Sequence, residues 1–152
     1  MATVYLGLGT NLGNKEANLR TAIYKLQERI GKQVSLSSFY ETAPWGFESD
    51  HSFLNAAIGL ETSLSPIEIL HITQEIEKEL GRTKKSVNGS YSDRLIDIDI
   101  LLYDNLVLQT PELTIPHPLM TERDFVMKPL IEIAGNVIHP TLQKTLSELY
   151  QE

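Results

Sequence analysis

Hydrophobic residues occupy every second position near the start of the chain. Val4, Leu6 and Leu8 alternate with polar or small residues, a period that predicts a β-strand with one buried face. A turn rich in Gly and Asn follows this strand. Further strand patterns cover residues 34–40, 53–61 and 94–103, and residues 106–108 predict a short return strand.

Two segments follow the 3.6-residue period of an amphipathic helix instead. The first covers residues 15–30. The second begins with a capping box, in which Ser65 is the N-cap, Pro66 the first helical residue and Glu68 the third. Gly81 marks its end. Shorter helices are predicted around 125–134 and 142–150.

These elements follow one another in the order β-α-β-β-α-β. That order is typical of an α+β, ferredoxin-like core, in which an antiparallel sheet packs against two helices. The last third of the chain then forms a C-terminal helical extension. We expect residues 1–152 to form a single domain. Because this fold hosts many activities, the function must be inferred from a site.

Composition narrows the possible functions. Thirteen Lys and Arg residues and twenty Asp and Glu residues give a net charge of −7. An acidic chain argues against a general binder of nucleic acid or membrane surfaces, because both favour a basic face. The absence of cysteine excludes disulfides, thiol catalysis and Cys-ligated zinc. The N-terminus lacks the features of a secretory signal, and no apolar run approaches the roughly 20 residues that span a bilayer, so we expect a cytoplasmic protein.

Two carboxylates stand on one face of the strand predicted over 94–103. Residues i and i+2 of a strand share a face, so Asp97 and Asp99 lie together while Ile98 points to the core. Carboxylates about 7 Å apart repel each other unless a positive group lies beside them. Mg²⁺ suits the pair, because it takes one or two carboxylates and adds water and phosphate oxygens. Taken alone, the motif favours an alternative, a solvated polar face.

A basic segment directly precedes this strand in an otherwise acidic chain. This segment, residues 82–93, contains Arg82, Lys84 and Lys85 and shows no apolar periodicity, and Arg94 follows it at the start of the strand. Arginine makes bidentate contacts with phosphate and lysine adds a point charge. An uncovered loop of this length is often a functional lid, although a plain solvated loop fits equally well. Together, the carboxylate pair and the basic segment indicate a metal and polyphosphate site, and without a Walker A motif it is not a P-loop.

Two smaller features add candidate ligand contacts. Phe53 and Asn55 share one face of a predicted strand, where an aromatic ring and a carboxamide can stack on and hydrogen-bond a flat heterocycle. An ordinary edge-strand aromatic beside a strand-end Asn is the alternative. His117 lies between two prolines, a stiff setting that suits a positioned hydrogen-bond donor but is also typical of a rigid surface turn.

Seven short motifs are spaced along nearly the whole chain. They are GTNL at 9–12, SSFYET at 37–42, FLNAA at 53–57, a TQ-IE-GR series over 73–82, RLIDIDIL at 94–101, TIPH at 114–117 and RDF at 123–125. In this order they resemble the 6-hydroxymethyl-7,8-dihydropterin pyrophosphokinase family, whose signature is R-x-x-D-[LIV]-D. Agreement of several ordered motifs is far more specific than any one of them.

The resemblance implies that the β,γ-pyrophosphate of ATP is transferred to the hydroxymethyl oxygen of a reduced pterin, with release of AMP, in folate biosynthesis. It implies catalytic roles for Arg82, Arg94, Asp97 and Asp99. Two Mg²⁺ ions would be held by Asp97 and Asp99, and Asp99 or a water beside it would accept the proton.

The same resemblance implies two sets of substrate contacts. ATP contacts are implied for Gln74, Glu77, Arg82, Lys84, Lys85, Arg94, Ile100, Thr114, His117 and Arg123. Pterin contacts are implied for Thr42, Ala43, Trp45, Phe53, Asn55, Tyr91 and Phe125. No nucleic acid, membrane or obligate protein partner is expected.

Two alternative functions stay open. One is a related Mg-dependent phosphotransferase or pyrophosphotransferase that acts on another flat alcohol acceptor. The other is a non-catalytic ferredoxin-like ligand sensor. Phe53, Asn55 and Phe125 favour a flat acceptor, and a carboxylate pair beside four cations argues against a sensor.

Overall fold

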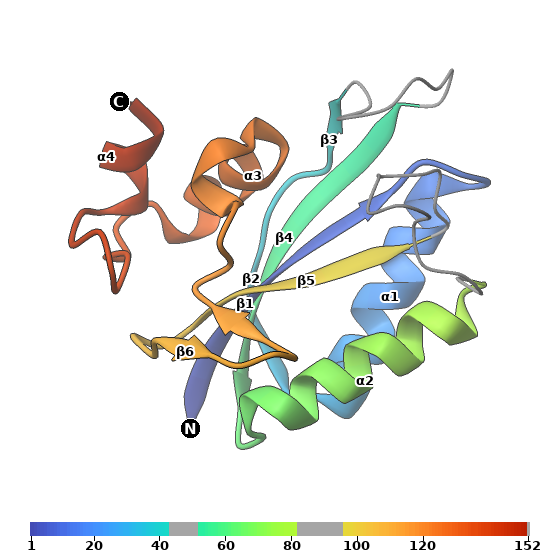
Figure 1. The fold of residues 1–152 in the computed structure, drawn as a ribbon. Coiled ribbons are helices and arrows are strands. Elements are labelled where there is room, and N and C mark those ends of the chain that lie inside the picture. The colour runs from blue at the N-terminus through green and yellow to red at the C-terminus, as the bar shows by residue number, and fades with distance from the viewer. Residues whose placement is uncertain (43–51, 82–95, 152) are drawn as a thin grey trace.

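A five-stranded antiparallel sheet forms the centre of the computed structural model, which describes residues 1–42, 52–81 and 96–151 (Figure 1). The elements are β1 (Ala2–Thr10), α1 (Lys15–Arg29), β2 (Lys32–Leu36), β3 (Tyr40–Thr42), β4 (Phe53–Thr62), α2 (Pro66–Glu79), β5 (Asp97–Tyr103), β6 (Leu108–Gln109), β7 (Thr114–Ile115), the 3₁₀ helix η2 (Met120–Glu122), α3 (Asp124–Ala134) and α4 (Leu146–Gln151). The strand order is β2-β4-β1-β5, and β3 adds to β4. This order confirms the expected ferredoxin-like core.

Helices cover both faces of this sheet (Figure 1). Alternating residues of β1, β4 and β5 pack under α1 and α2 in the first core, which includes Leu6, Ile58 and Ile98. A second core lies on the opposite face, where α3 and α4 cover Ala57 and Leu101. The central strands β1 and β4 are therefore packed between two layers of helices. Within the described residues, no helix is long and apolar enough to cross a membrane.

The start of α2 confirms the predicted capping box. The Ser65 Oγ accepts a hydrogen bond from the Glu68 N–H at 3.3 Å, and the Glu68 Oε1 accepts one from the Ser65 N–H at 3.0 Å. Pro66 then occupies the first turn, where its missing N–H costs nothing. Local sequence alone is thus enough to fix where this helix begins.

The strand predicted over 34–40 is wrong in its continuity, because the structure divides it into β2 and β3. Ser37 lies at the break, where its Oγ accepts a hydrogen bond from the Ala57 N–H at 2.9 Å. A side-chain oxygen thereby replaces the main-chain acceptor that a continuous ladder would supply. The two short strands pair with different parts of β4.

The return strand predicted at 106–108 also differs from the structure. Leu108 and Gln109 form β6, which pairs with β7 in a separate two-stranded sheet and not with β5. A tight turn closes this hairpin, because the Thr110 N–H donates to the Leu113 carbonyl at 3.0 Å. The small sheet carries the chain toward His117.

The ends of α1 and α2 are joined by an exposed ion-pair cluster. Glu79 accepts hydrogen bonds from Arg29 at 2.6 and 2.7 Å and from Lys25 at 2.9 Å. The bonds from Arg29 first, and then from Lys25, lower the pKa of Glu79 from 4.5 to about 2. A lowered folded-state pKa stabilises the folded chain above the unfolded-state value, and this stabilisation is lost as the pH falls through the folded-state value.

We therefore expect Glu79→Gln to lower the melting temperature at pH 6 by about 2 °C, and the difference to shrink steadily as the pH falls from 4.5 toward 2. Thermal unfolding followed by circular dichroism across this range measures the effect. Added salt should shrink the difference at pH 6, because these side chains are exposed and screened by ions. A difference that is equal at pH 6 and pH 2 would contradict the assigned ion pair.

Candidate active site

The candidate site lies on the sheet face away from α1 and α2, at the end where β1 stops and β4 and β5 begin. Two glycines of β1 lie on this face. Across the β1–β5 pairing Gly9 stands opposite Asp97 and Gly7 opposite Asp99, while Asn55 of β4 stands on the other side of Gly9. Strand pairing thus brings a carboxylate and a carboxamide to the two sides of one glycine.

Asp97 and Asp99 are partly exposed, whereas Ile98 between them is 6% exposed in the first core. The prediction that both carboxylates leave that core is confirmed. The Ile98 N–H donates to the Glu77 Oε2 of α2 at 2.8 Å, and Glu77 is itself buried. Glu77 therefore fixes the strand between the two carboxylates.

The donor set of this face suits a hard cation that shares its ligands with a phosphate. Among the described residues, no group of three or more His, Asp or Glu side chains is arranged to hold a metal. Asp97 and Asp99 nonetheless supply the one or two carboxylates that Mg²⁺ takes when water and phosphate oxygens complete its shell. The residues present thus fit Mg²⁺ bound together with a nucleotide.

His117 is a neutral hydrogen-bond donor held against β5. The main-chain N–H of His117 donates to the Leu101 carbonyl at 3.0 Å. The ring Nδ1 accepts a hydrogen bond from the Leu119 N–H at 3.2 Å, so the proton of the neutral ring is on Nε2. Burial and the charge of Arg123 lower the pKa of His117, while the charge of Asp97 acts in the opposite direction. These influences place His117 in one electrostatic neighbourhood with Arg123 and Asp97.

Arg123 and Phe125 mark the start of α3. Arg123 is 4% exposed, and its guanidinium carbon lies 5.6 Å from the centroid of the Phe125 ring. A guanidinium over an aromatic face keeps its charge and gains a cation–π contact. The arginine expected to contact phosphate thus lies beside the aromatic residue expected to contact the pterin.

Three residues of the expected pterin set come together where β3 meets β4. Thr42 stands opposite Phe53 in the register, and the Asn55 Nδ2 donates to the Thr42 Oγ1 at 2.8 Å. Asn55 is 3% exposed, so this bond fixes the orientation of a buried amide. Its Oδ1 lies so close to Gly9 that a Cβ added there would come within 2.9 Å of it.

The expected nucleotide contacts are more dispersed. Gln74 is exposed on α2, and Thr114 is half-buried on β7. Ile100 is 4% exposed and packs in the first core, so it can meet a nucleotide only through its main chain. That main chain lies on the edge strand of the sheet, where such contacts can form.

Several expected site residues lie outside the described residues. They fall in the segments 43–51 and 82–95, and they are Ala43, Trp45, Arg82, Lys84, Lys85, Tyr91 and Arg94. The lid expected for the basic segment falls there too. Their roles stay predictions.

Gly9, with Gly7 near it on the same strand face, is a position of the candidate site that the sequence did not suggest. As Gly-Leu-Gly they match no phosphate-binding motif, but two glycines on the same face of a buried strand are a sign of close approach by a neighbour.

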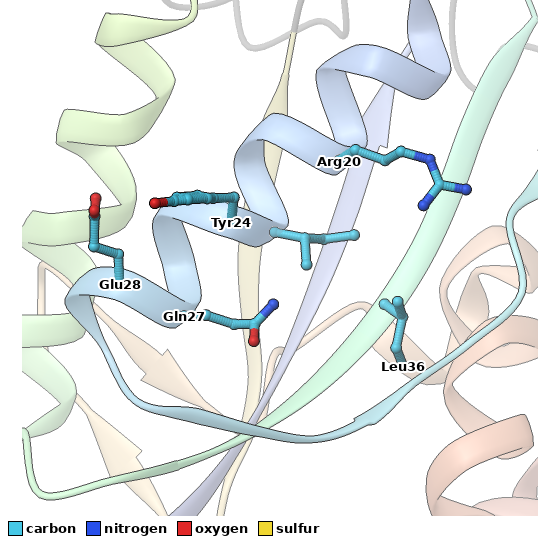
Figure 2. A pocket seen from close by; sticks show the side chains of 6 residues that line it. Arg20, Tyr24, Gln27, Glu28 and Leu36 are labelled. Carbon is cyan, nitrogen blue, oxygen red and sulfur yellow. The ribbon is translucent and has the colours of Figure 1, made fainter.

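Figure 2 shows a different surface feature, an open hollow on α1 lined by Arg20, Ile23, Tyr24, Gln27, Glu28 and Leu36. It contains none of the expected site residues.

Comparison with known proteins confirms the family resemblance of the sequence motifs. Residues 5–135 match the sequence model of the family described as 7,8-dihydro-6-hydroxymethylpterin-pyrophosphokinase. A protein of Porphyromonas gingivalis named 2-amino-4-hydroxy-6-hydroxymethyldihydropteridine pyrophosphokinase is 57% identical over 141 residues, which cover 92% of this chain and 95% of that protein. A protein of the same name from Aquifex aeolicus is 45% identical and covers 100% of this chain and 92% of its own.

Solved structures share the fold. The crystal structure of wild-type Plasmodium falciparum HPPK-DHPS with pteroate matches with a TM-score of 0.79 and 16% identity. The match covers 99% of this chain and 44% of that longer chain. At this identity the likeness concerns the fold alone.

Proposed function

The chain belongs to the 7,8-dihydro-6-hydroxymethylpterin-pyrophosphokinase family, and on this premise we propose which of its residues carry out the reaction. The enzyme transfers pyrophosphate from ATP to 6-hydroxymethyl-7,8-dihydropterin in folate synthesis, and the transfer depends on Mg²⁺. The observation that carries the residue assignment is the pairing of Asp97 and Asp99 with the glycines of β1, beside Asn55.

Asp97 and Asp99 would hold Mg²⁺, with two ions expected. When bound, the metal neutralises and orients the phosphates. Asp99, or a water beside it, is the proposed acceptor of the proton from the pterin hydroxymethyl group. A bond then forms from this oxygen to the β-phosphorus, and the bond between the β-phosphorus and the oxygen of AMP breaks. Arg82 and Arg94 would offset the charge that develops on the transferred group.

The pterin would lie between the rings of Phe53 and Phe125. One N–H of the Asn55 amide is bonded to Thr42, and the amide would use its other polar atoms to bind the edge of the pterin. Main-chain groups near Ala43 and Trp45 would complete this recognition, and Tyr91 would cover the bound ring.

His117, whose main chain is bonded to Leu101 of β5, and Arg123 would contact the phosphates of ATP. Because the pKa of His117 is lowered, the neutral ring donates through Nε2 without adding a second full charge beside Arg123. The base and sugar of ATP would lie nearer Gln74, Glu77, Ile100 and Thr114. Ile100 would contact them through its main chain. Glu77 would act chiefly by holding β5 in place through its hydrogen bond with the Ile98 N–H. Lys84 and Lys85 would add charge to the phosphate site.

The purified protein should convert ATP to AMP only when a hydroxymethyl-dihydropterin and Mg²⁺ are both supplied. Separation of nucleotides after incubation, with and without the pterin, measures this conversion. A panel of flat alcohols tests for a different acceptor. Saturable pterin binding without any AMP would favour the ligand sensor, and no dependence on the pterin would reject the proposal.

A cytoplasmic location and one domain over 1–152 stay predictions.

We expect Gly9→Ala to weaken pterin binding by about tenfold. A Cβ at this position would lie 2.9 Å from the Asn55 Oδ1 and 3.6 Å from the Phe53 ring, so the amide would have to turn away. Gly7→Ala is the matched control, since its Cβ would meet the Leu101 side chain at an ordinary 3.4 Å. Fluorescence titration with the pterin compares the two variants. Equal affinities would mean that the Asn55 orientation does not matter for binding.

A further inference from the structure

We infer that Glu132 of α3 is a positioning residue for the pterin site, which it serves by holding β3 at a fixed distance from Phe125. The inference rests on the proposed function. Glu132 is remote in sequence from every residue assigned to the substrates except those at the start of its own helix.

Glu132 is the acceptor in a set of hydrogen bonds that ties α3 to the β2–β3 connection. Both of its carboxylate oxygens lie 3.0 Å from the Ser38 N, and its Oε2 accepts from the Ser38 Oγ at 3.1 Å. Its Oε1 accepts from the Tyr40 Oη at 2.5 Å. These bonds lower the pKa of Glu132, so the side chain is a carboxylate at neutral pH and its bonds are charge-assisted.

The strand held in this way carries one wall of the proposed pterin site. β3 has three residues, too few to be stable through pairing alone. Its Tyr40 stands opposite Asn55 and its Thr42 opposite Phe53, and Thr42 accepts the hydrogen bond from the Asn55 amide. A shift of β3 would therefore move the partner of Asn55.

The helix that holds β3 also carries the opposite wall. Phe125 and Glu132 are seven residues apart in α3, which places them on the same helix face about 10 Å apart along the axis. One rigid helix thus presents Phe125 at one end and anchors the Thr42 side of the site two turns later. The spacing between the two walls is set by this single element.

The test is Glu132→Gln, with Lys128→Gln, an exposed residue one turn earlier on α3, as the matched control. The glutamine amide nitrogen cannot accept the Ser38 N–H, so part of the anchor is lost. We expect the KM and the Kd for the pterin to rise about tenfold, and the KM for ATP to change by less than about twofold. The control should match the unsubstituted enzyme in all three constants.

Tyr40→Phe removes one of these bonds and leaves the others. We expect a rise of about threefold in the pterin KM, and a double variant with Glu132→Gln should show less than the product of the two effects. Tyr40→Phe decides the question if Glu132→Gln does not fold.

An unchanged pterin KM in folded Glu132→Gln, or equal losses for pterin and ATP, would overturn the inference. In Tyr40→Phe an unchanged pterin KM would do the same. A failure of the proposed function is distinct, because it would appear in the unsubstituted enzyme as an absence of pterin-dependent AMP. The inference fails only in the variants.

Discussion

Asp97→Asn and Asp99→Asn should each lower kcat by about 10³-fold and leave the enzyme folded. Each substitution keeps the size of the side chain and removes the charge that would hold Mg²⁺. Both side chains are partly exposed on the face away from the first core, so thermal stability should change little. Glu77 would still hold the Ile98 N–H between them, which keeps the strand in place.

Initial rates over a range of Mg²⁺ concentrations measure this effect. The expected result is a loss that excess Mg²⁺ only partly restores. Asp104→Asn is the matched control at the other end of β5, because an asparagine tolerates its φ of 48° and can still accept the Thr3 N–H. More than about a tenth of the activity retained in both variants would reject Asp97 and Asp99 as the metal ligands.

Arg82→Ala and Arg94→Ala should each lower kcat by about 10²- to 10³-fold while pterin affinity stays nearly unchanged. Their positive charges would stabilise the negative charge that develops on the pyrophosphoryl group during its transfer. Both arginines lie in the segment 82–95, which connects α2 with β5. Before it, α2 ends at Gly81 with a φ of 107°, and after it the buried Ile96 leads into β5. The bond from the Ile98 N–H to Glu77 joins these two elements.

Single-turnover rates separate the chemical step from binding. We expect the rate of AMP formation from the bound ternary complex to fall in both variants, with pterin titrations close to those of the unsubstituted enzyme. Arg20→Ala on α1, which lines the hollow of Figure 2, removes the same charge away from the site and should keep the normal rate. Normal single-turnover rates with weakened binding would assign Arg82 and Arg94 to substrate capture.

Local chemistry explains the parts of the fold that the sequence predicts well. The capping box that starts α2 involves neighbours in sequence, so its pattern is complete within four residues. The strand period of two residues is likewise visible within Asp97, Ile98 and Asp99 themselves, and the structure places both carboxylates on the expected face.

Contacts between distant residues explain what the sequence does not predict. The break between β2 and β3 depends on Ser37 meeting the Ala57 N–H, and no local pattern distinguishes this serine from one inside a strand. The bonds from Ser38 to Glu132 join residues 94 apart. In the sequence Gly9 cannot be distinguished from an ordinary strand glycine, because its close neighbour, the Asn55 side chain, is known only from the structure.

The irregularity of β5 has a consequence for changes in chain length. Its register shifts against β1 between Tyr5 and Leu6, and Leu101 and Leu102 both join the second core, whereas Tyr103 packs on the first. Up to Leu101, odd-numbered residues such as Asp97 and Asp99 face away from the first core. After Leu102 the alternation is reversed, and the odd-numbered Tyr103 faces the first core. Deletion of one of the two leucines would remove the extra residue of this bulge and restore a continuous alternation, in which Ile98, Ile100 and Tyr103 all still face α1 and α2. A single deletion should therefore be tolerated at Leu101 or Leu102, whereas a single deletion between Asp97 and Ile100 would turn one part of the strand over relative to the rest.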